Sequence, residues 1–156
     1  MAQNSDAHAL TRLINAAFEV ERLFIAGDRI DRNGALKYLS TGQFLLLEEA
    51  NALVGCVYLE KHDDHMYLGL LSIDPVLQGN GLGRRLMDAA EEFAINAGCV
   101  AMDLRTISQR KDIQPFYEHL GYVVTNMSPI PPEIPMAIPG RFVHMSKALC
   151  KSRSAP

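Results

Sequence analysis

The sequence predicts an α/β protein of the mixed α+β kind, in which a largely antiparallel sheet carries packed helices. Three apolar runs separated by short polar turns fill residues 44–73, which is typical of an antiparallel meander. Beyond residue 80, helical and strand-like segments alternate, as they do where helices pack on a sheet. The 156 residues, 48% of them hydrophobic, suit one domain. We expect it to span residues 1–150, followed by a flexible tail at 151–156.

The first half of the chain shows helical spacing and then strand-like runs. A polar cap signal at Ser5 and Asp6 precedes the first helical pattern. Helices are expected at residues 7–24 and, more weakly, from residue 31 or 33 to 39, and strands at 44–47, 53–59 and 66–73.

The second half contains the clearest helix, which runs from a glycine-rich segment to about Ala97. Leu82, Leu86 and Phe93 fall on one face of it, and Gly98 stands where a C-terminal cap belongs. A strand at residues 100–106, a short helix at 113–120 and strands at 122–125 and 141–148 are expected to follow. Five of the eight prolines lie within residues 128–140, so we expect a loop there.

Charge and composition exclude several classes of function. The net charge of −3 and the isoelectric point near 5.9 disfavour nucleic-acid binding. No run of 18 apolar residues and no secretory signal is present, so we expect a cytoplasmic protein without a membrane partner. Cys56, Cys99 and Cys150 lack a CxxC arrangement, which argues against disulfides and zinc. We expect the first two in the core, expect no metal, and leave a homodimer open.

The segment QGNGLGR carries the strongest chemical signal. Its three glycines in five positions, placed between a strand and a helix, would let the backbone approach a bulky anion. A phosphate-loop NTPase would need Lys followed by Ser or Thr after the last glycine, and a dinucleotide site would need glycine where Arg84 stands. The candidate anion-binding residues are Gln78, Gly79, Asn80, Gly81, Leu82, Gly83 and Arg84.

Gln78, Gly81 and Gly83 match a signature of Gln or Arg, two residues, Gly, one residue, then Gly or Ala. The strand-like LSIDP at residues 71–75 precedes it, and PFYEHLGY at 115–122 follows the long helix. In this combination the sequence resembles the GNAT superfamily of N-acetyltransferases over residues 42–149. The resemblance implies a mixed, mostly antiparallel sheet with helices on both faces and a splayed strand pair that binds CoA.

The resemblance also implies roles for individual residues. Acetyl-CoA would be the cosubstrate, with its pyrophosphate on the amides of residues 79–84. The backbone of Leu71, Ser72 and Ile73 would bind the pantetheine arm and the thioester carbonyl, where N–H groups can stabilise an oxyanion. Tyr117 would protonate the leaving thiolate. The alternative for Tyr117 is a core residue that packs with Phe116.

Two features of the sequence depart from the superfamily pattern, and one catalytic role has no assigned residue. Members of the superfamily often have asparagine where this chain has Arg110. This chain begins almost directly in the first helix, so the short strand that usually opens their fold is missing, displaced or supplied otherwise, which could expose a sheet edge. No general base is assigned, and the candidates are Glu60, His62, His65 and Asp112. His62 and His65 have metal-ligand spacing but are expected in a solvated turn.

The sequence therefore predicts an N-acetyltransferase in which a primary amine attacks acetyl-CoA directly. The acceptor is a small molecule or a peptide, and the mild acidity of the chain suits a cationic amine. We expect residues 128–140 and the first helices to border its pocket. The alternative is a CoA-binding sensor or interaction module without turnover.

Overall fold

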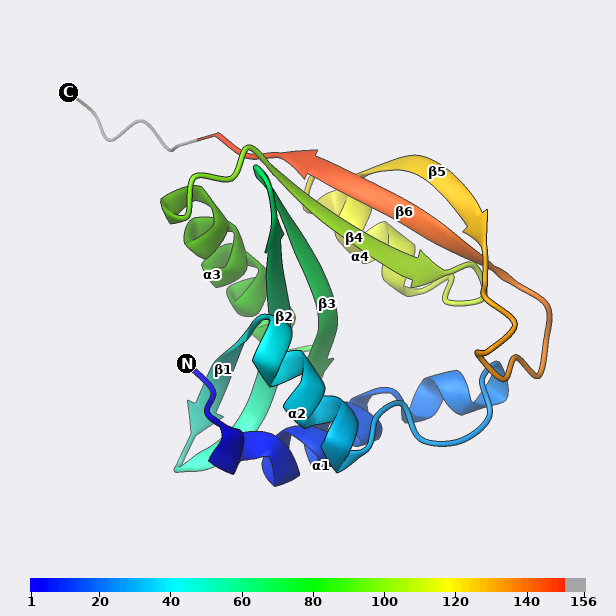
Figure 1. The fold of residues 1–156 in the computed structure, drawn as a ribbon, viewed down its shortest axis with the longest axis horizontal. Helices are drawn as coiled ribbons and strands as arrows, with labels where there is room; N and C mark the ends of the chain where they lie inside the picture. Colours follow the sequence, from blue (N-terminus) through cyan, green and yellow to red (C-terminus); the bar gives the residue numbers. More distant parts are fainter. Residues whose placement is uncertain (151–156) are drawn as a thin grey trace.

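A six-stranded mixed sheet organises the protein, and helices cover both of its faces (Figure 1). The computed structural model describes residues 1–150, so the tail expected at 151–156 lies outside the described residues. The strand order is β1-β2-β3-β4-β6-β5, and only β3 and β4 are parallel neighbours. The strands are β1 Gln43–Glu49, β2 Ala52–His62, β3 His65–Ile73, β4 Ala101–Ile107, β5 Val123–Pro129 and β6 Arg141–Ala148.

Among residues 1–150, four α-helices and three short 3-10 turns complete the fold. The helices are α1 Ala7–Ala17, α2 Arg32–Thr41, α3 Leu82–Asn96 and α4 Ile113–His119, and the 3-10 turns are η1 Asn4–Asp6, η2 Glu19–Leu23 and η3 Pro75–Leu77. Within residues 1–150, no helix is both long and apolar enough to cross a membrane. The predicted mixed fold with helices on both faces is confirmed.

Strand β2 is buried on both sides, which explains its continuous apolar run. Val57 and Leu59 belong to the core between the sheet and helices α3 and α4. Cys56 and Tyr58 belong to the core on the opposite face, under α1 and α2. Cys56 is fully buried and Cys99 is 6% exposed, so their predicted core positions are confirmed.

The predicted first helix is wrong beyond Ala17. Helix α1 ends there, and residues 19–23 form the separate 3-10 turn η2. Leu10 and Ile14 of α1 are fully buried, whereas Val20 and Leu23 lie exposed in η2. Burial of an apolar stripe stabilises most helices, so the helix ends where the stripe stops finding a core.

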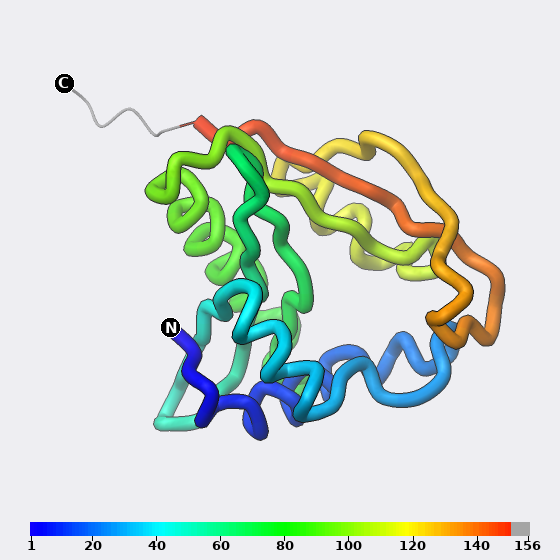
Figure 2. Tube along the Cα trace, in the orientation of Figure 1, coloured from blue at the N-terminus to red at the C-terminus, as the bar shows by residue number. Residues whose placement is uncertain are grey.

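The proline-rich segment begins later than predicted, because β5 continues through Ser128 and Pro129. Strand β5 is the last strand of the sheet, and an edge strand tolerates proline because one row of its N–H groups needs no strand partner. The remaining segment, residues 130–140, lies beside residues 24–26 (Figure 2). The amide of Ala26 donates to the Pro135 carbonyl at 2.9 Å.

The short opening strand, predicted to be missing, displaced or supplied otherwise, is absent from the described residues before the first helix. Strand β1 therefore forms the other edge of the sheet. The amide of Ala2 donates to the carbonyl of Phe44 at 3.3 Å. This one hydrogen bond satisfies a single carbonyl on the outer edge of β1, whereas a complete strand would cover the whole edge.

Strands β3 and β4 pair over only three residues and then diverge. The paired stretch joins residues 65–67 to residues 101–103. Figure 1 shows the two strands together at one end and apart at the other. Beyond Tyr67, the edge of β3 that faces β4 has no strand partner in the described chain, so the expected splayed pair is confirmed.

The paired end of these strands carries a histidine whose ionisation we expect to affect stability. His65 Nδ1 lies 2.7 Å from Asp103 Oδ2, and this hydrogen bond raises the pKa of His65 above its ordinary 6.5. A raised folded-state pKa adds stability that is fully present below pH 6.5 and is lost as the pH rises through the folded value. From about pH 5.5 to about pH 9, the thermal midpoint of the wild type should fall relative to that of Asp103→Asn.

Thermal unfolding followed by circular dichroism over this range tests the prediction. Asp64→Asn is the control, because Asp64 lies 3.9 Å from the other ring nitrogen of His65. Asp64 raises the pKa of His65 less than Asp103 does, so the control should keep most of the wild-type pH dependence. Parallel curves for the wild type and Asp103→Asn would contradict the prediction.

Candidate active site

The glycine-rich segment borders a cavity of about 340 Å³ between the end of β3 and helix α4. Most of the predicted cofactor residues meet here. The lining residues are Leu71, Ile73, Leu77, Gln78, Gly79, Gly81, Leu82, Gly83, Arg84, Ile113 and Phe116.

The shape of this loop depends on two glycines in the left-handed region. Gly79 has φ 87° and Gly81 has φ 77°, and a Cβ built at either position would meet no atom within 4 Å. The first hydrogen bond of α3 runs from the amide of Arg85 to the Gly81 carbonyl. The three preceding amides, of residues 82–84, therefore lack partners within the helix. Together with the exposed charge of Arg84, they make a suitable seat for phosphate oxygens.

The side chains of three predicted cofactor residues form hydrogen bonds to backbone carbonyls of the protein itself. Gln78 donates from Nε2 to the Ile73 carbonyl at 3.3 Å, which ties the loop to β3. Asn80 donates from Nδ2 to the Leu77 carbonyl at 2.9 Å. Ser72 is 1% exposed and donates from Oγ to the carbonyl of Leu70. Neither Ser72 nor Asn80 lines the cavity, so any contact to a ligand there would come from backbone.

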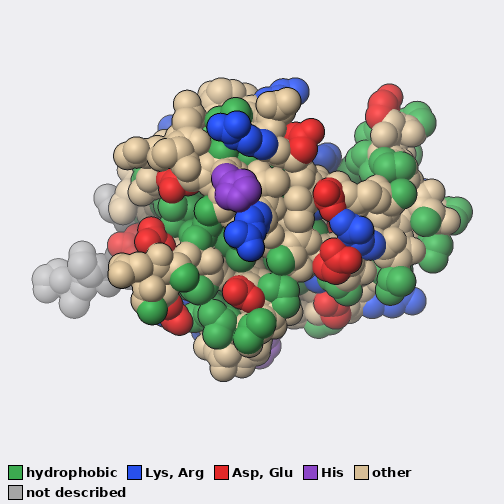
Figure 3. All heavy atoms as spheres, turned by 90° about the horizontal axis from the view of Figure 1, so that it is seen from below, with side chains coloured by type: hydrophobic (Ala, Val, Ile, Leu, Met, Phe, Trp, Pro, Cys, Tyr) green, Lys and Arg blue, Asp and Glu red, His purple; other side chains and the backbone are tan. Residues whose placement is uncertain are grey.

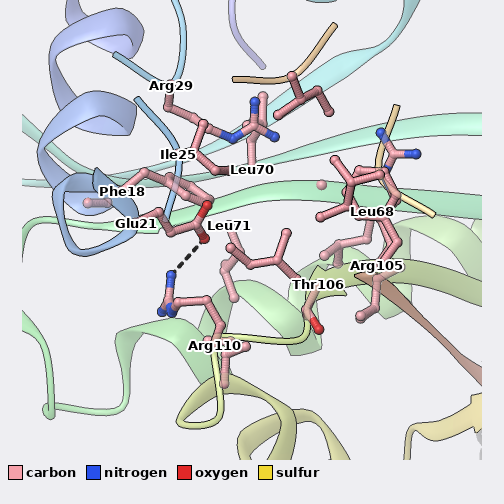
Figure 4. Close-up of a pocket in the computed structure, with 18 of the residues that line it drawn as sticks. Phe18, Glu21, Ile25, Arg29, Leu68, Leu70, Leu71, Arg105, Thr106 and Arg110 are labelled. Carbon is pink, nitrogen blue, oxygen red and sulfur yellow. Dashed lines mark hydrogen bonds and ion pairs between the residues drawn. The ribbon is translucent and has the colours of Figure 1, made fainter. Parts of the chain in front are cut away.

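A second cavity, of about 430 Å³, is lined by Leu68, Leu70 and Leu71 of the same strand (Figure 4). It shares Leu71 and Ile113 with the first cavity, so the two adjoin near the carboxyl end of β3 and the start of α4. Its walls come from the α1–α2 connection, from β3 and β4 beyond their paired ends, and from residues 130–135. The proline-rich segment and the region of the first helices, both predicted to border an acceptor pocket, contribute residues to this cavity.

Tyr117 of α4 lines this second cavity and is also part of the core. Its ring packs edge-on against Phe116 and Tyr122, at centroid distances of 5.2 and 5.9 Å. Burial raises the pKa of its phenol above the ordinary 10, so it stays protonated at neutral pH. Within residues 1–150, its hydroxyl makes no hydrogen bond. A protonated phenol of this kind can act as an acid but not as a base.

A largely buried ion pair lies beside Tyr117. Arg110 Nη1 lies 2.8 Å from Glu21 Oε2, and both side chains are 12% exposed (Figure 4). Arg110 also binds Asp112, at 3.0 and 3.2 Å. Burial raises the pKa of Glu21, and the charge of Arg110 opposes that rise. Arg110, the residue that replaces the expected asparagine, thus joins η2 to the loop before α4.

The comparisons with known proteins agree with this geometry. Residues 7–122 match the family model described as acetyltransferase (GNAT) family. The chain belongs to this family. Three solved structures share its fold. Ard1 from Thermoplasma volcanium aligns with a TM-score of 0.79 at 16% identity, over 96% of this chain and 95% of that one.

The other two structures align over similar lengths. The ribosomal-protein-S18-alanine N-acetyltransferase from Escherichia coli has a TM-score of 0.76 at 14% identity, over 99% of this chain and 95% of that chain. The protein yncA from Salmonella typhimurium, solved with its cofactor acetyl-CoA, has a TM-score of 0.73 at 23% identity, over 99% and 94%. The protein described here is thus an acyltransferase of the GNAT family.

None of the four base candidates predicted from sequence lines either cavity of this GNAT protein. His62 pairs with Glu60 at 2.5 Å, and His65 pairs with Asp103. The pKa of Asp112 is lowered by its hydrogen bond from Arg110. Within residues 1–150, no three His, Cys, Asp or Glu side chains gather as a metal site.

Glu21 is one of three acidic residues that line the larger cavity, and sequence reasoning missed it. The predicted helix over residues 7–24 gave no reason to place it near α4. Only the break after Ala17 brings η2 against the loop that carries Arg110. One sequence signal was available. The apolar positions that bury one face of the helix end near residue 17, and the apolar residues that follow, Val20 and Leu23, are exposed.

Proposed function

We propose that this protein transfers the acetyl group of acetyl-CoA to a primary amine by direct attack. The observation that carries the proposal is the junction of two cavities at Leu71, one beside the glycine loop and the other beside Tyr117. Acetyl-CoA has a nucleotide end and a reacting thioester end, and the two ends need adjoining sites of this kind. The acyl carrier would supply a thioester carbonyl that an amine can attack.

The cofactor end fits the glycine loop. The unpartnered amides of residues 82–84 and the side chain of Arg84 suit a diphosphate, and the open space beside Gly79 and Gly81 leaves room for it. The unpaired edge of β3, residues 68–73, offers backbone groups to the amides of a pantetheine arm. These contacts support acetyl-CoA as the cosubstrate.

The reacting end lies where β3 passes Tyr117. The amine nitrogen forms a bond to the carbonyl carbon, and the carbon–sulfur bond then breaks. Backbone N–H groups of residues 71–73 would stabilise the negative oxygen that develops. The Tyr117 hydroxyl would give its proton to the departing sulfur, and the amine would release its own proton to solvent or to a neighbouring base.

The test measures thiol release from acetyl-CoA across amines, amino acids and peptides, beside calorimetric binding of CoA. Turnover with at least one primary amine, together with an N-acetylated product in mass spectrometry, is the expected result. Binding without thiol release for every acceptor would favour the sensor. The absence of CoA binding to folded protein would overturn both functions.

A further inference from the structure

Three arginines from three different segments line the larger cavity. They are Arg29 from the loop before α2, Arg105 from β4 and Arg110 from the loop before α4. Arg110 is neutralised by Glu21 and Asp112. Within residues 1–150, Arg29 and Arg105 have no carboxylate within 4.0 Å. The cavity therefore holds two guanidinium groups without an ionic partner.

Aromatic rings hold these two guanidiniums in place without cancelling their charge. Arg29 lies over the ring of Phe18 at 5.4 Å, and Arg105 lies over the ring of Phe142 at 4.2 Å. Both rings also line the cavity. A stacked guanidinium keeps its planar N–H donors free for a carboxylate.

The two charges act on one place in the cavity. Burial raises the pKa of Tyr67, and the charges of Arg105 and Arg29 both oppose that rise. Tyr67 is the last residue of β3 that pairs with β4, so the arginines flank the point where the strands separate. In Figure 4, Arg29 reaches in from the side of Phe18, and Arg105 stands on the opposite side of Leu70.

The carboxylates that line the cavity leave these two arginines in excess by one charge. Glu21 is paired with Arg110, and Asp28 is paired with Arg22. Glu133 is the third lining carboxylate, and among the described residues it forms no ion pair. On the face shown in Figure 3, acidic and basic side chains are interspersed, so the preference for an anion is local to the cavity.

From this arrangement we propose that the acceptor is an amino acid, with its amine near Tyr117 and its carboxylate bound by Arg29 and Arg105. This inference rests on the proposed acetyl transfer. Glu21 and Arg110 both influence the pKa of Tyr117, which places the ion pair at the reacting end. A carboxylate bound beside Tyr67, where Arg29 and Arg105 act, would pair with the two guanidinium groups that lack an ionic partner. The cavity volume of about 430 Å³ suits a small ligand.

The test compares leucine with 3-methylbutylamine, which differs only in lacking the carboxylate. The wild type should have the higher kcat/KM for leucine. Arg105→Gln and Arg29→Gln should each reduce the ratio of the two kcat/KM values about tenfold, because each loses a charged hydrogen bond. The two amines differ in basicity, but this difference affects the ratio equally in the wild type and in each variant. It therefore cancels when the ratios of two proteins are compared.

Two further variants separate recognition from general damage. Arg105→Lys should retain more of the preference than Arg105→Gln, because it keeps the charge. Arg12→Gln removes an exposed arginine of α1 that does not line the cavity, and it should change nothing. A wild type that prefers 3-methylbutylamine, or cavity variants that reduce both rates equally, would overturn the inference while leaving acetyl transfer intact.

If no acceptor is turned over, a binding measurement tests whether Arg29 and Arg105 bind a carboxylate. Calorimetry then compares N-acetylleucine with N-(3-methylbutyl)acetamide on CoA-loaded protein. Tighter binding of N-acetylleucine, lost in Arg105→Gln, would support the arginine site even though the proposed function fails. Equal binding of the two compounds would reject the arginine site.

Discussion

Replacement of Tyr117 by phenylalanine should lower kcat about 10² to 10⁴-fold at saturating acceptor, since this is the usual contribution of a positioned acid. The leaving thiolate would then have to depart without a proton from the protein. The ring would remain, together with its contacts to Phe116 and Tyr122, so the core should stay packed. The Kd for CoA should change little, because the glycine loop is untouched. Steady-state kinetics and calorimetry on the same preparation measure both quantities.

Tyr122→Phe is the matched control for this variant. Tyr122 is buried in the same core, and its hydroxyl donates to Glu91 at 3.0 Å, outside both cavities. Its loss should reduce stability by about 1 kcal/mol and leave kcat nearly unchanged. If Tyr117→Phe turns over at the wild-type rate, Tyr117 is a core residue and the proton comes from elsewhere.

The glycine loop, the long helix and the meander could be predicted from sequence because each depends on local rules. Glycines at positions 79 and 81 indicate positive φ, and Gly98 marks a helix end, since few other residues adopt that conformation. The alternation of β3 predicts which of its side chains are buried. These signals lie within a few residues of the feature that they determine.

The acceptor side of the site could not be predicted in this way, because it is assembled from remote segments. Glu21 and Arg110 are 89 positions apart, and their contact depends on where α1 stops. Arg29 and Arg105 come together only because β3 and β4 separate. Neither event leaves a local pattern, so the sequence predicted that residues 128–140 and the first helices border the acceptor pocket without indicating the charged residues inside it.

Because the conformation of the glycine loop depends on single residues, a substitution there tests whether the loop binds the cofactor. Gly81 caps α3 at φ 77°, where a residue with Cβ costs about 1–2 kcal/mol. Gly81→Ala should relax out of this conformation and turn the free amides of residues 82–84 away from the cavity. We expect the Kd for acetyl-CoA to rise about tenfold or more, which corresponds to the loss of about 1.4 kcal/mol.

Gly83→Ala is the control, because it adds the same methyl group two residues later without the strain. Gly83 lies in the first turn of α3, and a Cβ there would make an ordinary 3.5 Å contact with the ring of Phe116. Alanine also favours the helix, so stability should increase by up to about 1 kcal/mol. Acetyl-CoA should bind this variant within about twofold of the wild type. Equal affinities for Gly81→Ala and Gly83→Ala would mean that the diphosphate does not bind at the amino end of α3.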